Sequence, residues 1–241
     1  GKVDLGEAAS PRVVQATSGD AKALVARVAD GVVVTLRSSI VSEALADDAE
    51  LVSLEACAEC KVNKALAAEW ATLRAPLVAA LAAQPHKVTV TGHGASAALA
   101  TLAALDLAEA GVPVSELVTF GEPRVGNPDF AAYYEDSAVY PHFRVTHGRD
   151  PVVHAPSAAA GFAHVGREVF FNKASSSYTM CGRGEDPACS LSVVLATGLD
   201  DHMSYMGENF AAKYLECAVA PADASSSAES ALMAKAAKQL A

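Results

Sequence analysis

The residues best suited to chemistry lie around a sharp glycine turn. A β-branched run, Val88–Thr91, is followed by the letters GHGAS at 92–96 and then by a segment rich in alanine and leucine. A strand, tight turn and helix in this order present a nucleophilic serine in the pattern G-x-S-x-G. Here Gly94 stands in the serine's place, and Ser96 stands where the second glycine is expected. The pattern predicts the frame of a nucleophile site without its hydroxyl.

Two later residues could complete such a site. A serine nucleophile needs an imidazole that takes its proton and a carboxylate that orients the imidazole. Asp150 follows an Arg-Val-Thr-His stretch and precedes Pro-Val, and His202 opens an H-x-x-Y segment that ends at Tyr205.

Three longer sequence motifs resemble those of a known family. The letters LVTFGEPRVGN at 117–127, RVTHGRDPVVH at 144–154 and DHMSYMG at 201–207 occur in this order. With the turn at 92–96 they resemble the class 3, or fungal-type, lipase family over residues 32 to 214. The resemblance implies an α/β-hydrolase fold, with a mostly parallel central sheet that starts as an antiparallel hairpin and carries helices on both faces. It also implies that Asp150 and His202 are the acid and the base of a vestigial dyad. The chain order of the glycine turn at 92–96 (the elbow), the acid and the histidine is that of this fold.

The chain departs from the family near the oxyanion site. The family carries an F-R-G-[ST] stretch that helps to bind the oxyanion, whereas residues 36–39 here read Leu-Arg-Ser-Ser. By the resemblance, Ser38 and Ala95 hold the oxyanion positions. Ser96 is the candidate for a displaced nucleophile. Two residues past the turn, however, its side chain is expected to point into the first helical turn rather than at the imidazole.

The elements that position these residues follow from periodicity. Residues 23–28 and 32–36 flank Asp30-Gly31 and predict a hairpin. Apolar residues at helical spacing predict a helix over 62–81, kinked at Pro76. Further strands are predicted at 88–91, 117–120, 143–146 and 168–171, which is the rhythm of a parallel sheet. The segment Ile40–Asp47 is either a lid or an ordinary connecting helix. These predicted strands and helices indicate one domain over 1–217, followed by an Ala/Ser/Pro linker and a short helix over 218–241.

Five cysteines bear on the compartment. Within the resemblance, Cys57 pairs with Cys60 in a loop before the long helix, and Cys181 pairs with Cys189, while Cys217 is left over; buried free thiols are the alternative. Two disulfides imply an oxidising compartment, so the chain is predicted to be secreted or to lie in an organelle lumen. A C-x-x-C pair can be half of a zinc site, but the second half is missing, and we predict no metal.

Composition excludes some partners. The net charge is −10 without a long Lys/Arg run, which argues against nucleic acid. The uncharged stretch from Val88 to Leu105 divides into a strand and a helix, so no membrane span is predicted. No cofactor is predicted either.

Two classes of function remain open. The first is a catalytically inactive lipase-like protein, a pseudoenzyme that binds a lipid or acyl ligand or protein partner subunits. The second is an active secreted lipase or esterase with a displaced nucleophile.

Overall fold

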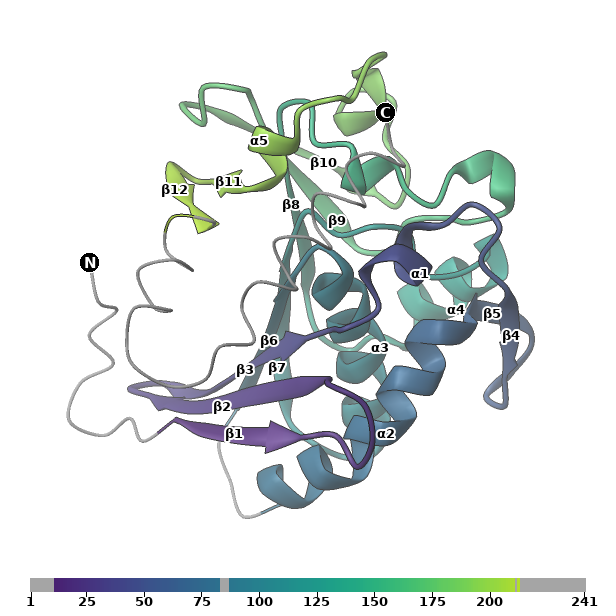
Figure 1. The fold of residues 1–241 in the computed structure, drawn as a ribbon, viewed down its shortest axis with the longest axis vertical. Helices are drawn as coiled ribbons and strands as arrows, with labels where there is room; N and C mark the ends of the chain where they lie inside the picture. The colour runs from purple at the N-terminus through teal and green to yellow at the C-terminus, as the bar shows by residue number, and fades with distance from the viewer. Residues whose placement is uncertain (1–10, 83–86, 211, 213–241) are drawn as a thin grey trace.

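The computed structural model describes residues 11–82, 87–210 and 212, and its centre is a twisted eight-stranded sheet (Figure 1). The sheet order is β1-β2-β3-β6-β7-β8-β9-β10. Its strands are β1 (Arg12–Gln15), β2 (Lys22–Val28), β3 (Gly31–Arg37), β6 (Val88–His93), β7 (Val114–Phe120), β8 (His142–His147), β9 (Arg167–Phe171) and β10 (Tyr178–Arg183).

The sheet is antiparallel at its edges and parallel in its middle. β1, β2 and β3 pair antiparallel, and the predicted hairpin joins β2 to β3. Its turn residues are Ala29 and Asp30, one position earlier than predicted, because Gly31 already belongs to β3 opposite Val28. From β3 through β6, β7 and β8 to β9 every pair is parallel, with Val34 opposite Val90 and Phe120 opposite Val145. β10 returns antiparallel beside β9. This arrangement confirms the predicted fold class.

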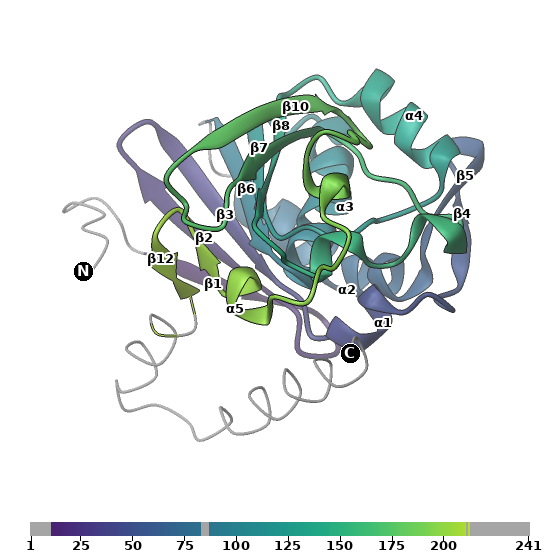
Figure 2. The same ribbon diagram turned by 90° about the horizontal axis from the view of Figure 1, so that it is seen from above.

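The helices pack on the sheet through apolar side chains. α2, α3 and α4 lie on the same side of the sheet in Figure 2, and α2 and α3 contact each other. Leu66, Leu73 and Leu77 of α2 are fully buried. The helices are α1 (Val41–Leu45), α2 (Lys64–Leu81), α3 (Ala95–Glu109), α4 (Pro128–Ser137) and α5 (Leu199–His202).

The start of α2 differs from the prediction. Val62 belongs to a strand, and the helix begins at Lys64 because the Asn63 side chain accepts hydrogen bonds from the N–H groups of Ala65 and Leu66. Such a cap satisfies amides that have no partner inside the helix. Pro76 lies inside α2, which runs on as one helix to Leu81.

Hairpins carry both predicted disulfides. Cys57 and Cys60 are joined at the start of β5 (Cys57–Asn63), which pairs with β4 (Leu51–Leu54); sequence analysis treats this segment as a loop. Cys181 of β10 is joined to Cys189. A third small pair is β11 (Ser204–Tyr205) with β12 (Glu208–Asn209). Cys217 and the segment 218–241 lie outside the described residues.

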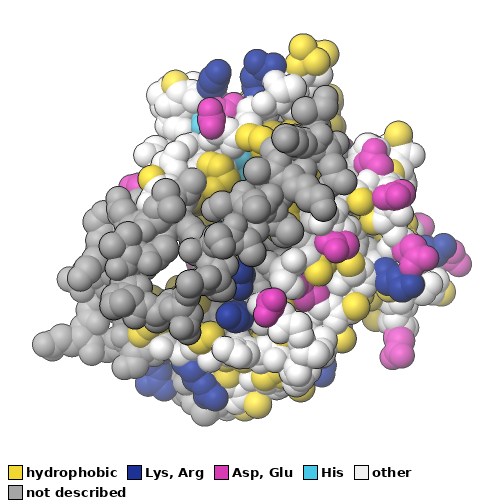
Figure 3. All heavy atoms as spheres, in the orientation of Figure 1, with side chains coloured by type: hydrophobic (Ala, Val, Ile, Leu, Met, Phe, Trp, Pro, Cys, Tyr) yellow, Lys and Arg dark blue, Asp and Glu magenta, His cyan; other side chains and the backbone are white. Residues whose placement is uncertain are grey.

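The topology brings the predicted site together at one edge. β6, β7 and β8 run parallel, so the turn after His93, the turn after Phe120 and the segment after His147 all lie at the carboxyl ends of the strands. In open parallel sheets this edge is where ligands bind. Over the described residues no helix has the length and apolar character needed to cross a bilayer. On the face in Figure 3, basic side chains lie interspersed with acidic ones.

Gly92 lets strand β6 and helix α3 approach closely. A methyl group at this residue would overlap the carbonyl group of Ser96 and approach the Ala97 nitrogen to 2.8 Å. We predict that Gly92→Ala lowers the free energy of unfolding by about 3 kcal/mol, the upper end of the range for overpacked sites. Denaturant unfolding measures this loss.

Gly111→Ala is the matched control. Gly111 has a φ of +84° but no heavy atom near the added methyl, so only backbone strain of about 1–2 kcal/mol is expected. Equal losses for the two variants would contradict the close-approach argument.

Candidate functional site

The turn after β6 holds Gly94 in a left-handed conformation. Its φ and ψ are 59° and −131°, and it directly precedes α3. The Gly94 N–H donates to the Phe120 carbonyl at 2.9 Å, which fixes the turn against β7. A Cβ atom built on Gly94 would lie 3.1 Å from Nε2 of His202. Any side chain at this position would therefore be directed at the imidazole.

His202 and Asp150 form the predicted dyad. Nδ1 of His202 lies 2.9 Å from Oδ2 of Asp150, and the two residues are 4% and 1% exposed. Asp150 has two further donors, the Val152 N–H to Oδ1 at 2.8 Å and the Tyr205 hydroxyl to Oδ2. A carboxylate only accepts hydrogen bonds, so Nδ1 carries the proton and Nε2 faces Gly94.

The surroundings keep Asp150 ionised. Burial acts to raise the pKa of Asp150, but the positive charge of His202 in its protonated form, together with hydrogen bonds from His202, Tyr205 and Val152, holds that pKa below its usual value. Burial, together with the negative charge of Asp150, raises the pKa of Tyr205 well above its ordinary value. Tyr205 is therefore a neutral hydrogen-bond donor to a charged acceptor.

Gly121 makes room for this cluster. It follows β7 with a φ of +57°. A Cβ atom here would lie 2.7 Å from the Tyr205 hydroxyl, 2.8 Å from Nδ1 of His202 and 2.9 Å from Oδ2 of Asp150. Only glycine leaves the three groups free to hydrogen-bond to one another.

His93 supports the imidazole from the strand side. Its ring stacks on that of His202 with centroids 4.3 Å apart, and its Nε2 lies 2.8 Å from the His202 carbonyl oxygen. Burial, reinforced by the positive charge of His202, lowers the pKa of His93 to about 3. This histidine is therefore uncharged and structural.

The serines of the predicted oxyanion loop make internal hydrogen bonds. The Ser38 N–H donates to Oγ of Ser96 at 2.9 Å, so the Ser96 hydroxyl lies against β3 rather than His202. The Ser38 hydroxyl donates to Oε2 of Glu69 at 2.6 Å. The N–H and hydroxyl of Ser39 both donate to Oε1 of Glu69 at 2.7 Å. Glu69, on α2, thus binds both serines.

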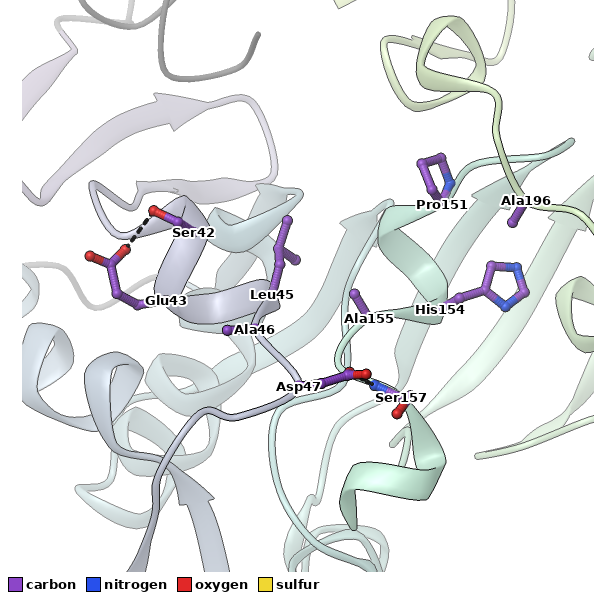
Figure 4. Close-up of a pocket in the computed structure, with 10 residues that line it drawn as sticks. All are labelled: Ser42, Glu43, Leu45, Ala46, Asp47, Pro151, His154, Ala155, Ser157 and Ala196. Atoms are coloured by element: carbon purple, nitrogen blue, oxygen red, sulfur yellow. Dashed lines mark hydrogen bonds between the residues drawn. The ribbon is translucent and has the colours of Figure 1, made fainter. Parts of the chain in front are cut away.

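A pocket of about 640 Å³ lies between α1 and the segment after Asp150 (Figure 4). Leu45, Pro151 and Ala155 give it apolar walls, and half of its lining residues are polar, including Glu43, Asp47 and His154. One end is closed by a hydrogen bond of 2.6 Å from the Ser157 N–H to Oδ1 of Asp47. The segment Ile40–Asp47 therefore forms one wall, and its use as a lid stays a prediction.

The structure unites some predicted residues and separates others. Gly94, Asp150 and His202 meet at one point, whereas Ser96 makes its hydrogen bond to Ser38 instead of the imidazole. Tyr205 could have been assigned a role from its fixed spacing to His202. Glu69 and Gly121 gave no such signal, because their contacts arise only on folding.

A metal site has weak support in the described residues. The one grouping of suitable atoms is Glu168, Cys181 and Cys189. Its two sulfurs form a disulfide and are not thiolates, which are the ligands that metals bind.

Comparisons with known proteins show that the chain is similar to lipases. Residues 33–160, just over half of the chain, match the family described as Lipase (class 3). A lipase of Rhizomucor miehei is 38% identical over 160 residues, which cover 62% of this chain and 44% of that protein. A secreted mono- and diacylglycerol lipase of Fusarium solani is 38% identical over 120 residues, covering 48% and 35%. The chain therefore spans less than half the length of these relatives.

A solved structure extends the similarity. It superposes with a TM-score of 0.72 at 33% identity and covers 84% of this chain and 82% of the other. That protein is described as a triacylglycerol lipase whose catalytic centre is a serine protease triad.

The Tyr205 hydroxyl contributes to stability through Asp150. We predict that Tyr205→Phe lowers the free energy of unfolding by about 1.5–3 kcal/mol at pH 7, the range for a hydrogen bond to a charged group. The measurement is urea unfolding, with Tyr178→Phe, on exposed β10, as the control. A loss no larger than that of the control would show that Asp150 does not depend on this donor.

His93 makes the fold sensitive to acid. Its pKa is about 3 when folded against 6.5 as the ordinary value, so unfolding takes up a proton in this range. The stability from a neutral His93 is complete above about pH 6.5 and is lost as the pH falls toward 3. We predict that His93→Gln loses less stability than the wild type between pH 7.5 and 5.0. Urea unfolding at the two pH values measures these losses. If the wild type and His93→Gln lose the same stability between pH 7.5 and 5.0, the assignment is contradicted.

Proposed function

The chain belongs to the class 3 lipase family, and we propose that it binds a lipid ester or acyl ligand at the Asp150–His202 site without hydrolysing it at an enzymatic rate. The observation that carries this proposal is the glycine at position 94. A side chain at this position would begin 3.1 Å from Nε2 of His202. Glycine has no hydroxyl, so the imidazole has no nucleophile to activate at the elbow.

The hydroxyl of Ser96 supports the same proposal. It accepts a hydrogen bond from Ser38, on the other side of the turn. Loss of a triad serine lowers turnover on the order of 10⁶-fold, with weak catalysis left from binding and oxyanion groups. The loop donors at Ser38 and Ser39 are also bound to Glu69 and Ser96.

The pocket beside α1 offers a place for the ligand's acyl chain. It reaches Pro151, the residue after Asp150, and its apolar walls come from α1 and the following segment (Figure 4). Pockets that bind small ligands combine apolar walls with a few polar groups in this way. Binding by protein partner subunits stays a prediction from the sequence.

Specific observations favour a second candidate, an active carboxylic ester hydrolase. The relatives are named as lipases, and the Asp150–His202 pair with its Tyr205 donor is intact. In this alternative a water molecule takes the place of the serine hydroxyl, and His202 acts as its general base. The names of the relatives favour hydrolysis, whereas the side chains at the elbow favour binding.

We propose an oxidising compartment, either outside the cell or in an organelle lumen. Disulfides persist in such compartments and are rare in the cytosol. Support comes from Cys57–Cys60 and Cys181–Cys189 and from the relative that is described as secreted.

Ester hydrolysis separates the two candidates. We expect the wild type to cleave short- and long-chain nitrophenyl esters at the rate of an Asp150→Ala, His202→Ala control, because no nucleophile is available. A fluorophosphonate probe should label neither protein. Wild-type turnover several orders of magnitude above the control would refute the binding proposal and establish the hydrolase.

Restoring one hydroxyl tests the loop. We expect Gly94→Ser alone to recover little activity, since the donors of Ser38 and Ser39 remain bound to Ser96 and Glu69. The same nitrophenyl assay measures this activity. A fast initial burst of nitrophenol release would show that the new serine reacts. Recovery of lipase-like turnover by this one change would show that the oxyanion side is intact.

A further inference from the structure

A second cavity lies at the opposite ends of the strands from Gly94. It has a volume of about 200 Å³, and it is lined by the last turn of α4, by the first residues of β8 and β9 and by the end of β10. Gly94 follows the carboxyl end of β6, whereas His142 and Arg167 begin β8 and β9. This cavity is therefore separate from the Asp150–His202 site.

Two arginine side chains meet at the rim of this cavity. Arg167 of β9 and Arg183 of β10 are directly opposite each other in the antiparallel ladder, and both line the cavity. Residues in such a pair have Cβ atoms about 5 Å apart on one face of the sheet, and like charges there are destabilising. The two strands thus place two positive charges side by side, in a chain whose net charge is −10.

Glu135 of α4 neutralises one of the two arginines. Its Oε2 accepts a hydrogen bond from Nη1 of Arg183, and its Oε1 accepts from the Gly166 N–H at 2.5 Å. Both carboxylate oxygens are therefore engaged. Glu135 is the acidic residue of the cavity lining, and within the described part of the chain no carboxylate forms an ion pair with Arg167. One positive charge at the rim is left uncompensated.

The remaining walls are mainly aromatic and uncharged. The Tyr134 hydroxyl lies 3.3 Å from that of Tyr140 and 3.0 Å from Nδ1 of His142, so these polar groups bond to one another within the fold. Burial raises the pKa of both tyrosines, so neither carries a negative charge at neutral pH. Phe143 and Pro141 add further apolar surface. The interior of the cavity therefore suits a hydrocarbon group, while its rim suits an anion.

We propose that this cavity binds a small aromatic monocarboxylate. Its carboxylate contacts the guanidinium of Arg167 beside Arg183, because the planar fork of arginine matches a carboxylate through two parallel hydrogen bonds. One negative charge balances the one uncompensated positive charge. The volume of about 200 Å³ suits a single ring rather than a long acyl chain. This inference goes beyond the proposed function and does not depend on it.

Benzoate, benzyl alcohol and acetate test the two parts of the site. Benzyl alcohol keeps the ring without the charge, and acetate keeps the charge without the ring. We expect benzoate to bind the wild-type chain at pH 7.5 with a Kd of about 1 mM, and each of the other two to bind about tenfold more weakly. Calorimetric titration measures these affinities. On ¹⁵N-labelled protein, benzoate should also shift the backbone amide resonance of Gly166.

Charge variants locate the carboxylate. Arg167→Gln removes the uncompensated charge and should weaken benzoate binding about tenfold. Arg12→Gln is the matched control, because Arg12 lies on β1 at the other edge of the sheet and its loss changes the net charge by the same amount. Glu135→Gln keeps an oxygen for the Gly166 N–H but frees Arg183, so it should tighten benzoate binding roughly fivefold.

Several results would overturn the proposal. Equal effects of Arg167→Gln and Arg12→Gln would show that benzoate responds only to net charge. Benzyl alcohol that binds as tightly as benzoate would indicate an apolar pocket, and tighter binding of inorganic phosphate would indicate a phosphate site. Absence of saturable benzoate binding would remove the site altogether. None of these results affects the proposed lipid binding at Asp150 and His202, which lies at the other ends of the strands.

Discussion

The buried carboxylate of Asp150 is the interaction on which the site depends. A charge at 1% exposure is costly unless it is well hydrogen-bonded. Its three donors come from α5, from β11 and from the N–H of Val152. These contacts hold the short segments near the end of the described chain against the parallel sheet, and Gly121 provides the space in which they meet. The orientation of His202 follows from this arrangement.

A second carboxylate organises the opposite side of the turn. Glu69 accepts three hydrogen bonds from Ser38 and Ser39, and it fixes the end of β3 to α2. The two carboxylates have different consequences for a ligand. Asp150 directs an imidazole toward the elbow, whereas Glu69 directs hydroxyl and amide donors away from it. The Asp150–His202 pair therefore faces the elbow, while the donors on the other side are bonded within the fold.

The sequence predicted most of the sheet and the dyad, because apolar periodicity and long motifs mark them directly. Val88–Thr91 is found within β6, and Asp150 and His202 meet as expected. The hairpin β4–β5 was missed because its Cys-x-x-C motif was interpreted as a loop. β10 was missed because its apolar side chains are largely exposed. Glu69 could not be assigned a role from sequence, since its partners lie about thirty residues away along the chain.

The hydrogen bond from Ser38 to Ser96 has a mechanical consequence for α1. It joins the end of β3 to the first turn of α3, and Glu69 binds the next residue, so the chain is held rigidly as far as Ser39. At its other end α1 is tied by Asp47 to Ser157. The Asn63 side chain also donates to the Glu43 carbonyl in the middle of α1. Any swing of α1 away from the pocket must therefore break this hydrogen bond as well as the contact at Asp47 before the pocket can widen.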